Sequence, residues 1–112
     1  MRKFTDAELG LAPKVAEVMG HEPRLEGLPK DMLSAFIRGY LSEHDCLEWL
    51  REKGWLIEHI HNLSGSGSWY VRVGKEMALP SDIFPKFSKI APELLEALYR
   101  CIVEIGKGGD DA

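Results

Sequence analysis

Hydrophobic and polar positions follow two different spacings in the middle of the chain. Within Ser42–Lys53 the apolar residues recur at helical spacing around Leu50. The blocks that follow, Trp55–Leu63 and Ser68–Val73, are rich in aromatic and β-branched residues and are joined by a Ser-Gly loop. This change of pattern predicts an amphipathic helix followed by an antiparallel β-hairpin.

Alternation along the hairpin assigns its side chains to faces. In the second strand, Tyr70 and Arg72 point to one side. The apolar residues of that strand point to the other side: Trp69, Val71 and Val73. In the first strand we expect Trp55 and Ile57 to face inward. Strict alternation places two histidines on that same face: His59 and His61.

Helical patterns also occupy three segments outside the hairpin. Thr5–Met19 begins with a capping-box pattern, but Pro13 removes an amide donor, so we expect a short first turn, a break and then a helix. Pro29–Leu41 begins at a first-turn proline. Pro92–Ile105 begins in the same way and is apolar over roughly two-thirds of its circumference. A helix this apolar is either sandwiched between two layers or also used in self-association.

The connection Gly74–Ile90 shows no clear period, and we predict no regular structure there. It is long for such a connection in a compact domain. It is also too apolar for a free linker, because it contains Met77, Leu79, Ile83, Phe84 and Phe87. We expect the segment to pack along an edge of the domain or to meet a partner. Closing the core is the competing role for its last three apolar residues.

Length and composition fit one compact domain. The chain has 112 residues, of which 45% are hydrophobic, so it can bury a core without metal or disulfide bonds. The sequence predicts an α+β domain over residues 1–106 and a disordered tail over 107–112. Its antiparallel sheet is built on a central β-hairpin and packs against N-terminal, middle and C-terminal helices. No stretch approaches the ~18 consecutive apolar residues of a membrane-spanning helix.

Candidate chemistry is sparse in this sequence. Cys46 and Cys101 lie in apolar helical stretches without metal-type spacing, which predicts buried, reduced thiols and a cytoplasmic location. His59 and His61 form a His-x-His pair, but a metal site needs three or four converging ligands, so we predict no metal. The Ser-Gly loop lacks the phosphate-binding pattern, and no nucleophile elbow is present. We therefore expect neither a cofactor nor enzymatic activity.

The order of elements also fits a winged-helix regulator. In that arrangement Ser42–Lys53 is the recognition helix and the hairpin is the wing. The outward positions of this helix are largely acidic, and the net charge of the chain is −4. Both are unfavourable for a phosphate backbone, so nucleic acid is an unlikely partner.

Several short motifs resemble a known family. They are VAEVMG at Val15–Gly20, YLSEHD at Tyr40–Asp45, LREKGW at Leu50–Trp55, WYVRV at Trp69–Val73 and PELLEALYRCIVEI at Pro92–Ile105. Together they resemble the phage ABA sandwich domain family, small proteins of tailed phages and prophages. The resemblance covers most of the chain. It implies a layered α+β fold in the cytoplasm of a bacterial host, and it implies no activity.

Binding is the function that these observations favour. If the resemblance holds, the chain is a phage accessory protein that engages a host protein and inhibits a host defence system. The residues expected to make the contact are Tyr70, Arg72, Met77, Ile83, Phe84 and Phe87. Two alternatives remain open, a winged-helix DNA-binding regulator and a sponge that sequesters a nucleotide signal between sheet and last helix. A homodimer through the C-terminal helix is also open.

Overall fold

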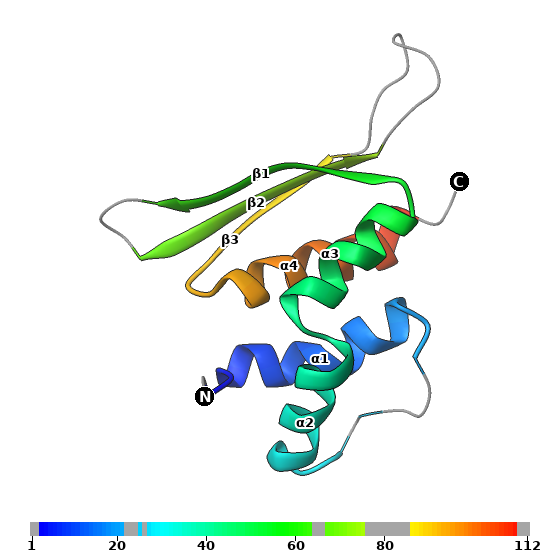
Figure 1. Ribbon diagram of the computed structural model, residues 1–112, viewed down its shortest axis with the longest axis vertical. Coiled ribbons are helices and arrows are strands. Elements are labelled where there is room, and N and C mark those ends of the chain that lie inside the picture. Colours follow the sequence, from blue (N-terminus) through cyan, green and yellow to red (C-terminus); the bar gives the residue numbers. More distant parts are fainter. Residues whose placement is uncertain (1–2, 22–24, 26, 64–66, 76–85, 110–112) are drawn as a thin grey trace, which may run out of the picture.

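The computed structural model describes residues 3–21, 25, 27–63, 67–75 and 86–109. The elements in this part of the chain are α1 (Asp6–Val18), α2 (Lys30–Tyr40), α3 (Glu43–Glu52), β1 (Trp55–Leu63), β2 (Ser68–Lys75), β3 (Lys86–Ala91), α4 (Leu94–Glu104) and a π-helical turn, η1 (Ile105–Gly109). The strands form one layer, and the helices lie on one side of it (Figure 1). The predicted α+β class is confirmed. None of the described helices has the length and apolar character needed to cross a bilayer.

The helix and the first strand of the central block begin and end within a residue of the predicted positions, whereas β2 continues two residues beyond the predicted Val73, to Lys75. Ser42 caps α3, because its side chain accepts from the Asp45 amide while the Asp45 carboxylate accepts from the Ser42 amide. This reciprocal capping satisfies two amides that a helix start would otherwise leave open. Gly54, at φ +84°, follows the helix and lets the chain turn directly into β1. The strands β1 and β2 then pair antiparallel from Trp55 to Leu63.

A third strand extends the hairpin into a sheet with the order β1-β2-β3. β3 pairs antiparallel with β2, which is therefore the central strand. The prediction of no regular structure up to Ile90 was wrong for residues 86–90. β3 has no clean alternation because Lys89 stands on the same face as Phe87 and reaches Glu104 of α4, Nζ to Oε1 3.4 Å. A charge satisfied from another element cannot be anticipated from the strand alone.

A β-bulge in β1 overturns the predicted faces of its second half. The register with β2 shifts between Ile57 and His59, so Glu58 is the extra residue. Trp55 and Ile57 face inward as predicted, since Trp55 is buried and Ile57 packs against the core. Beyond the bulge, each side chain of β1 lies on the face opposite to the one that strict alternation predicts. His59 and Arg72 are register partners and share the outer face.

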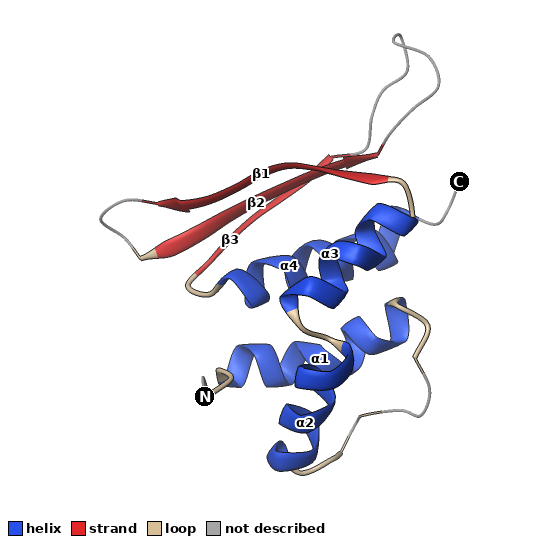
Figure 2. Cartoon of the chain, viewed as in Figure 1, coloured by secondary structure: helices blue, strands red, loops and turns tan. Residues whose placement is uncertain are grey.

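Helix α4 is the centre of the core. It contacts α1 on one side, β2 and β3 on the other, and also α3 (Figure 2). Residues around most of its circumference are buried: Leu95, Glu96, Ala97, Leu98, Tyr99, Cys101, Ile102 and Val103. Burial between two layers accounts for the unusually wide apolar surface of this helix. Of the two explanations predicted for it, the sandwiched helix is the one observed, without need of a second chain.

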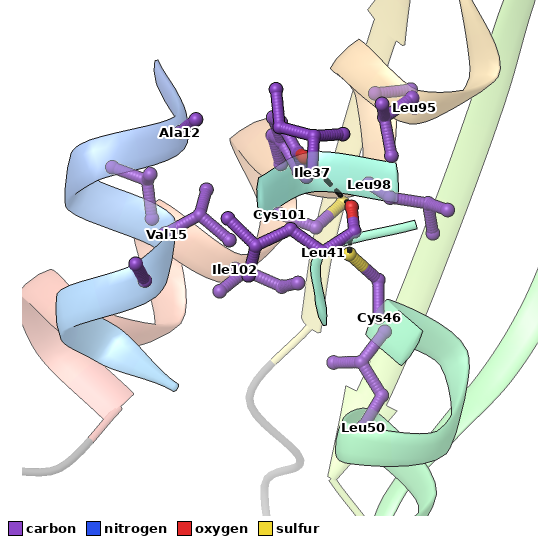
Figure 3. Packing of buried hydrophobic residues seen from close by; sticks show 14 of the residues in the cluster. Ala12, Val15, Ile37, Leu41, Cys46, Leu50, Leu95, Leu98, Cys101 and Ile102 are labelled. Atoms are coloured by element: carbon purple, nitrogen blue, oxygen red, sulfur yellow. Dashed lines mark hydrogen bonds between the residues drawn. The ribbon is translucent and has the colours of Figure 1, made fainter. Parts of the chain in front are cut away.

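One hydrogen bond ties α4 to the junction between α2 and α3. The buried Tyr99 hydroxyl donates to the Leu41 carbonyl at 2.7 Å. The Cys46 thiol contacts the same oxygen, with Sγ at 3.9 Å. Leu41 is fully buried beside Leu98 and Ile37 (Figure 3). A buried carbonyl without a partner is costly, so this contact helps to fix the direction in which the chain leaves α2.

Helix α1 is continuous through Pro13, and the predicted break was wrong. Thr5 and Glu8 form the predicted capping box, with the Thr5 amide donating to Glu8 Oε1 at 2.7 Å. Proline removes one internal hydrogen bond and crowds the preceding turn. Here the helix packs along α4 with Ala12 and Val15 fully buried on that side. We attribute the continuity to this packing, which outweighs the local cost of the proline.

Candidate functional site

The helices cover one face of the sheet and leave the other open (Figures 1 and 2). The strand register identifies the residues of this second face, because paired residues of antiparallel strands point to the same side. We call the following set the open face: Leu56, His59, His61, Tyr70, Arg72, Ser88 and Ile90. It lies opposite the fully buried Val71 and Val73.

An ion pair and a ring contact organise the middle of the open face. The Arg72 guanidinium lies against Glu58, with Nε to Oε1 3.0 Å. The bulge places Glu58 beside β2, within reach of this arginine. The rings of His59 and Tyr70 stand next to each other, with centroids 6.3 Å apart. Because the arginine is matched by a carboxylate, this part of the surface has little net charge.

Two exposed aliphatic residues flank these polar groups. Leu56 on β1 is 51% exposed and Ile90 on β3 is 60% exposed. Ile90 is the register partner of Tyr70. Leu56 and Ile90 lie on opposite edge strands, with the row of His59, Arg72 and Ser88 between them, so they do not form one contiguous apolar patch. The open face combines Leu56 and Ile90 with tyrosine, histidine and arginine side chains.

The residues predicted to make contacts separate into three groups. Tyr70 and Arg72 lie together on the open face. Phe87 lies on the helix-covered face, where its ring packs against Trp55 with centroids 5.6 Å apart, so it contributes to the core. Three of the predicted residues lie outside the described part of the chain: Met77, Ile83 and Phe84.

Sequence reasoning missed four members of the open face. Alternation without a bulge put His59 and His61 on the inner side. Ser88 and Ile90 were assigned to an irregular connection, whereas placing Trp55 and Ile57 inward already left Leu56 on the outer side. The outward placement of His59 and His61 could have been predicted only by anticipating the bulge at Glu58. No feature of the local sequence announces it.

No metal or nucleophilic centre accompanies this surface in the described residues. No three His, Cys, Asp or Glu side chains there converge as metal ligands would. Cys46 and Cys101 are fully buried free thiols on the helical side of the molecule. The described residues of the open face offer polar, aromatic and aliphatic side chains for contact.

The two thiols should be inert in the folded protein. Burial raises the pKa of Cys101 to about 12, and burial together with the carboxylates of Asp45 and Glu43 raises the pKa of Cys46 further. Because only the thiolate is alkylated, iodoacetamide at pH 8 should leave the native chain unmodified and add two groups in urea, as read by intact mass. Unfolded thiols ionise near 9.0 and folded ones do not, so stability should fall as the pH rises above that value. Rapid modification of the native chain would contradict this burial.

Comparisons with protein-family models, curated proteins and solved structures found no match to this chain. The functional argument therefore depends on the residues and their arrangement.

Proposed function

We propose that the chain is a small binding protein that engages another protein through the open face. Under its resemblance to phage ABA sandwich domains, it is a phage or prophage accessory protein acting in the cytoplasm of a bacterial host. The partner is then a host protein, and inhibition of a host defence system is the consequence of binding. The observation that carries the proposal is a sheet face that the described helices leave open and that presents Tyr70 and Arg72 between two exposed aliphatic residues, Leu56 and Ile90.

The composition of the open face supports a protein partner. Tyrosine and arginine are enriched at protein interfaces, and aliphatic side chains that become fully covered supply much of the binding energy. The ion pair between Arg72 and Glu58 leaves no strong positive field on this surface. Phosphate backbones require such a field, so the same surface does not favour nucleic acid.

The two alternative functions gain less support. In a helix-turn-helix unit the recognition helix is braced by the preceding helix. Here α3 packs on β1 and α4. Among its exposed or half-exposed residues are Glu43, Asp45 and Glu48, which disfavour contact with DNA.

A nucleotide sponge needs a cavity between the sheet and α4. Buried side chains occupy that region, and Cys101 Sγ lies 3.9 Å from the Val71 carbonyl oxygen.

Charged substitutions on the open face test the proposal. We expect the tagged chain to retain a stoichiometric protein from a host lysate. Combining Leu56→Glu with Ile90→Glu should weaken that complex by more than about tenfold, because two carboxylates would be buried against the partner. The complex should be measured by titrating the retained protein against each purified variant.

Met32 provides a matched control. It lies on α2, away from the sheet, and is 55% exposed, close to the value for Leu56. Met32→Glu should bind as tightly as the wild type, and all variants should keep the circular dichroism spectrum of the wild type. Equal loss of binding in both variants would place the interface elsewhere. Failure of the wild-type chain to retain any stoichiometric protein would count against the proposal as a whole.

A further inference from the structure

The two edges of the sheet differ in their protection against pairing with another strand. β3 has six residues and contains Lys86 and Lys89. Lys89 stands on the helix-covered face, where it pairs with Glu104 at 3.4 Å. Short length, lysines and an inward-pointing charge are features that keep an edge strand from recruiting another chain. β3 is therefore a protected edge.

β1 is a less protected edge. It has nine residues, and within the described chain its only strand neighbour is β2. The bulge between Ile57 and His59 protects its first half. The segment His59–Asn62 follows the bulge, is exposed, and contains no lysine, proline or acidic residue. In an edge strand every second residue directs its N–H and C=O away from the sheet. This segment is thus a template for a further strand.

Ile60 adds an apolar contact at the same place. Its register partner, Val71, is fully buried, so both side chains lie on the helix side of the sheet. Ile60 nevertheless remains 39% exposed. Ile60 lies on the edge strand β1, which within the described chain has a strand neighbour on one side only. A strand added alongside β1 would cover this side chain.

We propose that two copies of the chain pair through His59–His61 of their β1 strands, antiparallel about a two-fold axis at Ile60. The two three-stranded sheets then form one continuous six-stranded sheet. A two-fold antiparallel pair sets one residue opposite its own counterpart. Ile60 is the aliphatic residue of the segment and suits that position.

The charges of β1 favour this register with a second copy. Pairing about Ile60 sets Glu58 opposite Asn62 of the second copy, so the carboxylates of the two chains do not face each other. It sets His59 opposite His61 on the outer face. Three paired residues of each chain, flanked by Glu58 and Asn62, bury far less than the ~800 Å² per partner of a standard interface, so the dimer is weak and concentration-dependent. The pairing leaves the open face of both copies exposed and is independent of the partner proposed above.

Cysteine cross-linking tests both the contact and its register. Opposed residues of antiparallel strands have Cα atoms ~4.5–5.5 Å apart, within the range that a disulfide spans. Ile60→Cys should therefore form a disulfide-linked dimer under mild oxidation at high protein concentration. In Asn62→Cys the two introduced thiols lie four residue steps apart, more than ~13 Å, and should cross-link at least tenfold more slowly. The native Cys46 and Cys101 are fully buried and serve as an internal background.

Sedimentation equilibrium supplies the second test. The apparent mass of the wild-type chain should rise with concentration toward that of a dimer. Ile60→Lys, which introduces the protection found in β3, should remain monomeric with an unchanged circular dichroism spectrum. Equal cross-linking rates for the two cysteine variants, or a wild-type chain that stays monomeric at every concentration, would overturn the proposal.

Discussion

Replacing Leu98 with alanine should lower the free energy of unfolding by about 2–5 kcal/mol. Leu98 is fully buried in α4, between the sheet and α1, and neighbours Leu41 and Ile37 in Figure 3. Surrounding elements on both sides of α4 are fixed, so the cavity can close only in part. Urea unfolding followed by tryptophan fluorescence should show a lower midpoint with an unchanged slope. For a domain whose total stability is about 5–15 kcal/mol, this is a large fraction.

The same substitution at Leu56 is the matched control. Leu56 is 51% exposed on the outer side of the sheet and leaves no cavity when shortened. Leu56→Ala should therefore cost less than about 1 kcal/mol. Similar losses at the two positions would mean that α4 is not the centre of the core. The comparison thus tests the layer arrangement independently of any binding function.

The predictable parts of the fold are those specified by neighbouring residues. The capping box of Ser42 and Asp45, with Gly54 after the helix, fixes α3 and the start of β1 within a residue or two. The wide apolar surface of the last helix likewise predicts its burial. In each case the signal and the structure it determines lie within a few residues of each other.

The parts that could not be predicted depend on contacts between distant segments. Helix α1 continues through Pro13 because α4 packs against it, and α4 begins more than 70 residues later. The sequence does not predict β3 as a strand because Lys89 interrupts its alternation, and the carboxylate that pairs with Lys89 belongs to Glu104 on another element. Neither partner is visible in the local pattern. Local periodicity reports the intrinsic structural preference of a segment. The structures of α1 and β3 depend instead on tertiary contacts with α4.

The candidate site was predictable to the same extent. Alternation in β2 correctly places Tyr70 and Arg72 on the outer side, because that strand has no irregularity. The histidines of β1 were assigned to the wrong side because one bulged residue reverses all later positions. Ile90 could join the open face only once β3 was known to be a strand. The chemistry of the site was therefore visible in part, while its extent required the pairing of all three strands.

Replacing Gly106 with alanine should destabilise the protein by about 1–3 kcal/mol. Gly106 lies in the π-helical turn η1, where it meets the end of α1. A Cβ atom there would overlap Val18 Cγ2 and lie 3.2 Å from Val18 Cγ1. Valine is β-branched and has essentially one rotamer in a helix, so it cannot turn away without moving α1. Urea unfolding should register the loss as a lower midpoint.

Gly10 and Val18 supply the controls for this substitution. Gly10 lies within α1 and has no atom within 4 Å of the position that a Cβ would occupy. Gly10→Ala should therefore stabilise the protein by about 0.5–1 kcal/mol, through the better helix propensity of alanine. Adding Val18→Ala to Gly106→Ala should recover part of the loss, because the overlapping methyl groups are gone. A double-mutant cycle measures this coupling between the two sites. If Gly106→Ala and Gly10→Ala shift stability in the same direction, η1 does not pack against α1 as described.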